Sequence, residues 1–278
     1  MTTFLALVVF CYVRGWLHVR MAFLHIVDLR HMTAFISGLV AIWVAAGTPL
    51  AIMDHELLSI HMVQHLLLMA VAPPLILLGA PIPGLLHGLP KRFIQDGLDP
   101  FLRSAPLRHL GRIIRYPAFC WFAGTLTVIG WHLSSLFAIG LHSVVCHEIE
   151  QASFLLAGLL FWWPVIQPWP SAYRGSEWSV PLYLFLATLP CDALSAFLTF
   201  CGRVIYPSYL SASHPHHISA LQDQEWAGVF MWVSVTFIYM LPALLLTVRM
   251  LSPSISEAVT LGSKTFQISS LPPRRVGE

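Results

Sequence analysis

Long apolar runs separated by short polar segments form the main pattern of this chain. An α-helix needs about 20 predominantly apolar residues to cross the hydrocarbon core of a bilayer. Runs of about that length lie at residues 3–19, 33–53, 60–79, 117–140, 143–166, 180–202 and 227–249. The pattern predicts an all-α fold, a polytopic transmembrane bundle of about seven helices, with a single domain over residues 1–250 and a cytoplasmic tail over residues 251–278.

Composition agrees with this prediction. Hydrophobic residues make up 57% of the chain, charged residues 10%, and the mean hydropathy is +0.73. Soluble domains carry about 25% charged residues, so a soluble globular protein is excluded. The five cysteines include no CxxC pair and would leave one unpaired, so no disulfide framework is indicated. We expect the first run to be a retained helix; because Arg14 and Gly15 interrupt it, an incompletely inserted or processed segment is the alternative.

Positive charges are distributed unevenly over the segments between the runs. The longest segment, residues 87–117, holds six cations, and cytoplasmic loops are enriched in Lys and Arg. Placing this segment in the cytoplasm and alternating the others puts all but two of the 15 cations, Arg14 and Arg203, on the cytoplasmic side. The sequence thus predicts an N-terminus outside and a C-terminus in the cytoplasm. Topology and contact with anionic membrane lipids explain these charges, and no nucleic-acid partner is predicted.

The third run carries ionisable side chains at a depth where lipid is the expected neighbour. His61 and His65 lie four residues apart, so a helix places both imidazoles on one face, together with Gln64. Polar groups inside a membrane are costly and usually serve a site or a pathway, so a ligand or proton role is favoured over plain hydrogen bonding across the bundle. Imidazole suits copper and zinc, and thioether sulfur favours Cu(I). For Met62 and Met69, however, ordinary gap filling is the favoured role.

Two prolines follow these histidines in the same run. Pro73 and Pro74 lack amide hydrogens, so the carbonyls of Met69 and Ala70 lose their usual helical partners. The sequence predicts a kink there, below the histidines, which would close a site toward the cytoplasm.

A second group of candidate ligands, the motif HEIEQ, lies at the outer start of the fifth run. His147 and Gln151 share a helix face, and Glu150 lies beside them. If this helix faces His61 and His65, the two helices would supply imidazole and carboxylate ligands to one metal in the bundle core. The motif differs by one residue from the HExxH motif of zinc proteases. The alternative is a helix start whose acidic residues interact with the helix dipole.

Other polar residues are weaker candidates. Asp192 lies mid-membrane, where a carboxyl must be protonated or paired, so a functional and a structural role are equally open. For the three residues that open the last helix, helix capping is the simpler explanation. Histidines in a flexible loop have no defined geometry and are expected to be solvated. The set comprises His132, His142, Asp192, Asp223, Gln224, Glu225, His214, His216 and His217.

Four motifs, in this order and spacing, resemble a known family. They are HMVQHLLLMAVAPPLILLGAP, FLLAGLLFWWPVIQPWP, RVIYPSYL and DQEWAGVFMW, spread from about Asp54 to Met240. They look like the CtaG family of caa-type cytochrome c oxidase assembly proteins. The resemblance implies a seven-helix protein of the bacterial inner membrane that helps to build the terminal oxidase, with copper handling as its chemistry. This sequence departs from the family pattern at Gln151, where similar proteins tend to have histidine.

The residues and the resemblance together lead to one expectation and two alternatives. We expect a non-enzymatic assembly factor that holds or passes copper at the outer (periplasmic) face, with oxidase subunits as partners. Its metal ligands would be His61, His65, His147 and Glu150. The first alternative is a non-metal scaffold for oxidase subunits, and the second is an intramembrane metalloenzyme or a haem carrier.

Overall fold

The computed structural model describes most of the chain, and the described residues contain helices and no strands. Several residues that the sequence analysis used lie outside the described part. They are most of the predicted tail, the loop histidines His214, His216 and His217, and the cations Lys91, Arg103, Arg115 and Arg174. The described residues are 1–22, 28–90, 92–102, 104–114, 116–166, 178–211 and 218–252.

Six helical segments of the described chain are long and apolar enough to cross a membrane. One is composite, built from α4 (Leu58–Leu66), the π-helical turn η1 (Leu67–Val71) and α5 (Ala72–Leu78). The others are α1 (Thr2–Ala22), α2 (Leu29–Gly47), α11 (Val144–Ile166), α12 (Ser179–Phe200) and α13 (Ala220–Leu251). The all-α membrane bundle predicted from the apolar runs is therefore confirmed.

The predicted helix at residues 117–140 is broken in the structure. It consists of α9 (Pro117–Trp131) and α10 (Ser134–His142), which meet at an angle of 76° and give a seventh span if they are counted as one. The backbone at this corner is tied to a distant loop, because the hydroxyl of Tyr206 donates to the carbonyl of His132 at 3.0 Å. The second run also differs, since α2 ends at Gly47 and the short helix α3 (Leu50–Met53) follows it.

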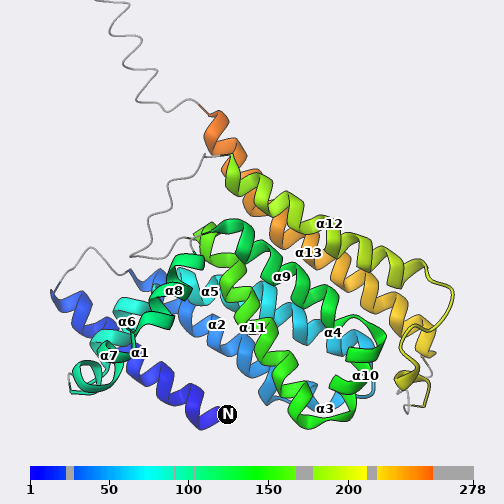
Figure 1. Ribbon diagram of the computed structural model, residues 1–278, viewed down its shortest axis with the longest axis horizontal. Helices are drawn as coiled ribbons and strands as arrows, with labels where there is room; N and C mark the ends of the chain where they lie inside the picture. Colours follow the sequence, from blue (N-terminus) through cyan, green and yellow to red (C-terminus); the bar gives the residue numbers. More distant parts are fainter. Residues whose placement is uncertain are drawn as a thin grey trace, which may run out of the picture.

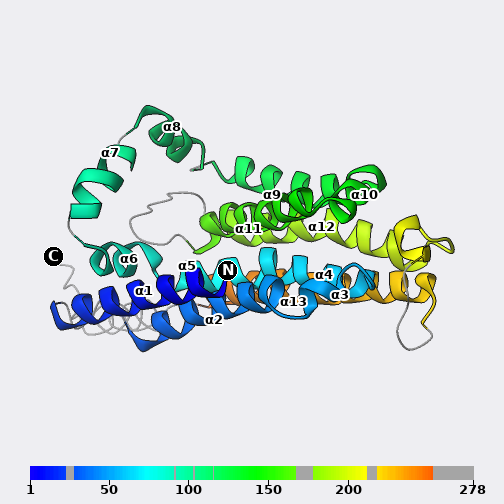
Figure 2. The ribbon, with the colours of Figure 1, turned by 90° about the horizontal axis from the view of Figure 1, so that it is seen from below.

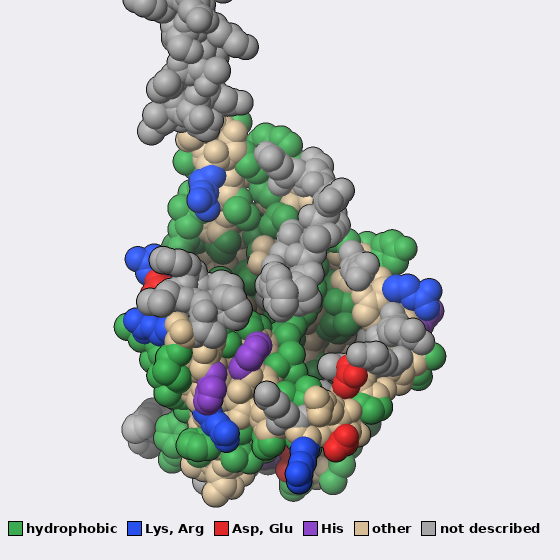
Figure 3. Space-filling view, turned by 90° about the vertical axis from the view of Figure 1, so that its left-hand side faces the viewer, with side chains coloured by type: hydrophobic (Ala, Val, Ile, Leu, Met, Phe, Trp, Pro, Cys, Tyr) green, Lys and Arg blue, Asp and Glu red, His purple; other side chains and the backbone are tan. Residues whose placement is uncertain are grey.

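The short helices lie at two separate ends of the molecule. At one end lie α6 (Pro81–Gly88), η2 (Phe93–Leu98), α7 (Asp99–Leu102) and α8 (Ala105–Ile113), and at the other lie α3, α10 and the 3₁₀ turn η3 (Pro207–Ser211) (Figures 1 and 2). We call the first the basic end, because Lys and Arg side chains are spread around its surface (Figure 3). Exposed cations of the segments that reach it are Arg20, Arg92, Arg112 and Arg249. We call the second the site end.

The composite span α4–η1–α5 is the most enclosed helix of the bundle. Within its most apolar window 56% of the residues are buried, against 22–39% in the other spans. Small residues on its neighbours let it pack closely, as expected for helices in lipid. A Cβ added to Gly158 of α11 would lie 2.6 Å from the carbonyl oxygen of Met69, and one added to Gly38 of α2 would lie 2.7 Å from Ile76.

Where the sequence predicts a proline kink, the structure has a π-helical turn. In η1 the amide of Ala72 donates to the carbonyl of Leu67, five residues earlier, just before Pro73 and Pro74 interrupt the normal ladder. Such turns occur frequently at functional sites. This one lies directly after the two histidines of α4, so it widens the helix on the side of the candidate ligands that faces the basic end.

The start of α4 is stabilised by a side chain from another helix. The carboxylate of Asp223, in α13, accepts hydrogen bonds from the backbone amides of Leu58 at 2.6 Å and Ser59 at 3.2 Å. The first amides of a helix have no partner within the helix, and their positive ends attract an anion. Asp223 therefore caps α4, whereas its own helix is capped by Ser219.

We expect Asp223→Ala to destabilise the fold, because it leaves two buried amides without partners at a cost of about 1–3 kcal/mol. Asp223→Asn keeps one acceptor oxygen and should lose less. Thermal unfolding of the purified protein in detergent, followed by circular dichroism, measures both, with Glu225→Ala as a control two residues further along α13. Equal unfolding temperatures for wild type and Asp223→Ala would contradict the capping role.

Candidate metal centre

The structure brings the four predicted ligands together at the site end. The Nε2 atoms of His61 and His65 are 2.7 Å apart, and Oε1 of Glu150 lies 3.6 Å from the first and 3.3 Å from the second. All three side chains are buried. Helix α11 therefore faces α4. The sequence analysis could only assume this arrangement.

Aromatic rings and a glycine hold this cluster in place. Phe154 stacks on the His65 ring with centroids 4.0 Å apart, and Phe137 meets the edge of His61 at 5.0 Å. A Cβ added to Gly140 of α10 would lie 2.7 Å from Oε2 of Glu150, so a larger residue there would displace this carboxylate. The bend between α9 and α10 is what lays α10 across the cluster.

Asp54 belongs to the same cluster, although the sequence did not single it out as a ligand. Its carboxylate is fully buried, with Oδ2 lying 2.9 Å from Nε2 of His147, and its carbonyl accepts a hydrogen bond from the hydroxyl of Tyr209. Burial raises the pKa of Asp54, but the hydrogen bond from His147 and the charges of His55 and His61 outweigh it and hold the pKa below its ordinary value. Asp54 is therefore a carboxylate at neutral pH.

The predicted ligand His147 lies between the two carboxylates. Its Nε2 is near Asp54, and its Nδ1 is 3.5 Å from Oε2 of Glu150. One nitrogen or oxygen from each of Asp54, His61 and His147 forms a second group that could hold a metal, beside the group of His61, His65 and Glu150. The amide nitrogen of Gln151 lies 2.8 Å from Nε2 of His147, so the residue that departs from the family pattern contacts the cluster.

The weaker candidates separate into residues that join the cluster and residues that do not. His132 is buried beside it, with ring centroids of His132 and His65 6.4 Å apart. His142 is exposed, and Asp192 accepts a hydrogen bond from Thr236 of α13 at 3.4 Å, away from the cluster. The explanation that Asp223 caps its own helix is wrong, because Ser219 caps α13 and Asp223 instead caps α4. The side chain of Gln224 bonds the backbone of Leu198, Arg203 and Ile205, which fixes the loop after α12.

The charges of the cluster favour a bound cation. Asp54 and Glu150 are buried carboxylates, and among the described residues only histidines lie within ion-pair distance of them. The oxygens of Glu150 lie 3.3–3.6 Å from ring nitrogens of His61, His65 and His147. A buried anion that is not neutralised is costly, so a proton, an imidazolium or a metal ion must balance this charge.

The spacing of the ligand atoms also fits a metal. In a tetrahedral site with ligands about 2.0–2.1 Å from the ion, neighbouring ligand atoms are roughly 3.3 Å apart. The corresponding distances among His61, His65 and Glu150 are 2.7, 3.3 and 3.6 Å. Two imidazoles and a carboxylate suit copper or zinc.

An open cleft leads from the surface to this cluster. It has a volume of about 460 Å³ and is lined by residues of α2, α3 and α11, with His55, His147, Glu148 and Gln151 as its main polar groups. Exposure decreases inward, from 47% for the side chain of His55 through 12% for His147 to 1% for His61. The cleft therefore reaches the edge of the buried cluster at His147.

Comparisons with known proteins place the chain in a family. The family model for the cytochrome c oxidase caa3 assembly factor, Caa3_CtaG, matches residues 10–252. An uncharacterized protein of Mycobacterium leprae (strain TN) is 26% identical over 229 residues, which is 80% of this chain and 34% of that protein. Uncharacterized proteins of Mycobacterium bovis and Mycobacterium tuberculosis are each 26% identical over 209 residues, 72% of this chain and 31% of theirs.

The chain spans about a third of the length of the curated relatives it matches. No solved structure matches it. The family match nevertheless extends over α2 to α13, including every helix that contributes to the buried cluster. This chain accordingly belongs to the family of cytochrome c oxidase caa3 assembly factors.

Proposed function

We propose that this assembly factor binds copper in the buried cluster of the site end and delivers it to cytochrome c oxidase subunits. The observation that carries the proposal is the convergence of His61, His65 and Glu150 inside the bundle, with their ligand atoms 2.7–3.6 Å apart. Ionisable side chains are rarely buried at this depth without a function. Copper is here the cargo, so the role is binding and transfer rather than catalysis.

Each part of the cluster has a distinct task in this proposal. His61 and His65 supply neutral nitrogen ligands from one helix face, and Glu150 supplies a negative charge that offsets the charge of the ion. Phe137 and Phe154 pack on the imidazoles and exclude water from them. Asp54 and His147 form the adjacent group through which an ion from the cleft would pass.

The orientation follows from the charges at the two ends. Cytoplasmic segments are rich in Lys and Arg, and the exposed cations of the basic end include Arg92 and Arg112. We therefore place the basic end in the cytoplasm of a bacterial inner membrane and the cleft at the periplasmic face. Oxidase subunits that receive copper from outside would dock there.

The alternatives differ in what they require of the histidines. A non-metal scaffold needs His61 and His65 only as hydrogen-bonding groups, so oxidase assembly would survive their replacement. A haem carrier using both as opposite ligands does not suit the geometry, because Nε2 atoms 2.7 Å apart leave no space for a haem plane between them.

Replacing both histidines should abolish copper binding by the centre. We expect His61→Ala/His65→Ala to lower the copper content of purified protein by about one ion per chain, measured by mass spectrometry of the metal, and to leave oxidase without its copper in cells that depend on this factor. His18→Ala/His87→Ala, two exposed histidines toward the basic end, is the matched control. Equal copper in all three proteins would refute the ligand role.

A subtler change moves Glu150 without removing a ligand. Gly140→Ala places a methyl group against Oε2 of Glu150, so we expect copper affinity to fall roughly 10- to 100-fold, as for other changes around metal ligands. Gly130→Ala is the control, because a Cβ there has no neighbour within 4 Å. Competition titration with a copper chelator measures both, and equal affinities would argue against Glu150 as a ligand.

The orientation can be tested with single cysteines in a chain whose native cysteines are replaced. Arg203→Cys, in the exposed loop of the site end, should react with a membrane-impermeant maleimide on cells whose inner membrane is intact. Arg112→Cys at the basic end should react only after that membrane is opened. The reverse pattern would place the cleft in the cytoplasm and contradict delivery from outside.

A further inference from the structure

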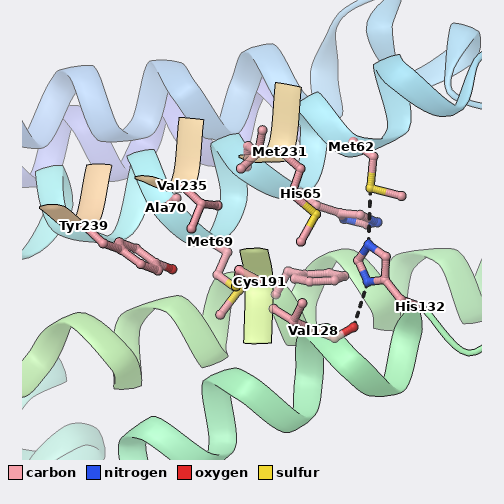
Figure 4. A pocket seen from close by; sticks show the side chains of 12 residues that line it. Met62, His65, Met69, Ala70, Val128, His132, Cys191, Met231, Val235 and Tyr239 are labelled. Atoms are coloured by element: carbon pink, nitrogen blue, oxygen red, sulfur yellow. Dashed lines mark hydrogen bonds between the residues drawn. The ribbon is translucent and has the colours of Figure 1, made fainter. Parts of the chain in front are cut away.

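A small, mostly apolar cavity lies directly beside the centre, and four of the twelve residues that line it carry sulfur. Its volume is about 30 Å³, enough for one ion or water molecule. Its lining includes three of the chain's nine methionines, Met62, Met69 and Met231, together with the thiol of Cys191. These residues come from α4, η1, α12 and α13, and Figure 4 shows Met62 beside His132, with Met69 and Cys191 further from that pair. A water molecule needs two to four polar partners, which such a lining scarcely offers.

The hydrogen bonding of His132 leaves an imidazole lone pair directed at this sulfur. Its Nδ1 lies 2.7 Å from the carbonyl of Val128, which can only accept a hydrogen bond, so Nδ1 carries the proton (Figure 4). A metal-binding histidine is typically held in this way by its other nitrogen. The free Nε2 lies 3.3 Å from Sδ of Met62.

This contact joins two electron-pair donors with no hydrogen between them. A thioether has no proton to donate, and a second proton on His132 would place a charged imidazolium in an apolar, sulfur-lined space. A cation bound between Nε2 and Sδ would turn the contact into an attractive one. Imidazole with thioether or thiol sulfur is the ligand set that selects Cu(I) among biological metals.

His65 connects the cavity to the first cluster. Its ring lines the cavity, while its Nε2 faces His61 and Glu150. The π-helical turn that follows α4 contains Met69, and a Cβ on Gly124 of α9 would lie 3.4 Å from the methyl carbon of this methionine. The ordinary alternative is that the methionines fill irregular gaps, but gap filling does not account for the unprotonated nitrogen against sulfur.

We propose that this cavity is a second, softer metal station that holds Cu(I) through His132 and the thioethers of Met62, Met69 and Met231, with Cys191 at its edge. The inference rests on the proposed function, because copper reaches the cavity past His65 from the cluster of nitrogen and oxygen ligands. The ion stays Cu(I) throughout, so no electron is exchanged between the stations. A carrier with two stations can hold one ion deep in the bundle while a second enters from the cleft.

The test uses the full chain, labelled with selenomethionine, purified in detergent and loaded anaerobically with Cu(I). X-ray absorption at the copper edge should show selenium next to copper, which distinguishes methionine ligands from the thiol of Cys191. Met62→Leu/Met69→Leu/Met231→Leu, nearly isosteric changes, should remove the selenium signal and one of two bound copper ions. Met32→Leu/Met53→Leu/Met240→Leu, which replaces methionines outside the cavity, should retain both.

This design distinguishes failure of the first cluster from failure of the cavity station. His61→Ala/Glu150→Gln removes ligands of the first cluster only, so copper with nitrogen and oxygen neighbours should be lost from it. If that variant keeps all its copper while the leucine variant loses one ion, the first cluster is refuted and the cavity station stands. If the labelled wild type shows no selenium next to copper, the cavity station is overturned, whether or not the leucine variant folds.

Discussion

The structure depends on one electrostatic constraint, which is that negative charge is buried inside a helical bundle in lipid. Asp54 and Glu150 are almost inaccessible, and histidines are the only described basic side chains within ion-pair distance of them. Lysine or arginine would neutralise the carboxylates permanently, whereas imidazole can release its proton and bind a metal. The cluster is therefore stable only in combination with protons or a cation, which is the property that a metal carrier needs.

The rest of the bundle holds this arrangement in place from several directions. Asp223 reaches from α13 to cap α4, the helix that carries both histidines. Tyr209 and Tyr206 bond the backbone of Asp54 and His132, so one loop fixes two sides of the site. Gly158 lets α11 approach the central span closely enough for Glu150 to reach the imidazoles. These contacts come from helices far apart in sequence and meet at the site end.

Two kinds of potential metal ligand lie side by side in the described part of this protein. His147 of the nitrogen and oxygen group lines the cleft, and four sulfur-containing side chains line the cavity behind His65. Exposure falls from His55 through His147 to His61, and the cavity beyond them adds softer sulfur atoms. In the copper delivery proposed above, a buried soft site would protect reduced copper from water until a partner receives it.

The apolar runs of the sequence determined the fold class and the position of most helices, because length and hydropathy alone decide what can cross a bilayer. Helical spacing likewise determined that His61 and His65 share a face, since that geometry is local. The missing amide of Pro73 indicated that the helical ladder is interrupted there, but not that the interruption is a π-helical turn.

Only the tertiary structure decided which segments meet. Asp54 directly follows the short helix α3, outside the third span, and the sequence offered no periodic signal that linked it to His147. The 76° bend between α9 and α10 was not visible, because both halves are apolar and their hydropathy continues across the break. His132 and the three methionines line one cavity because their helices pack together. Their spacing along the chain does not indicate this. The sequence thus showed which residue types form the site, whereas long-range packing between helices brought them together.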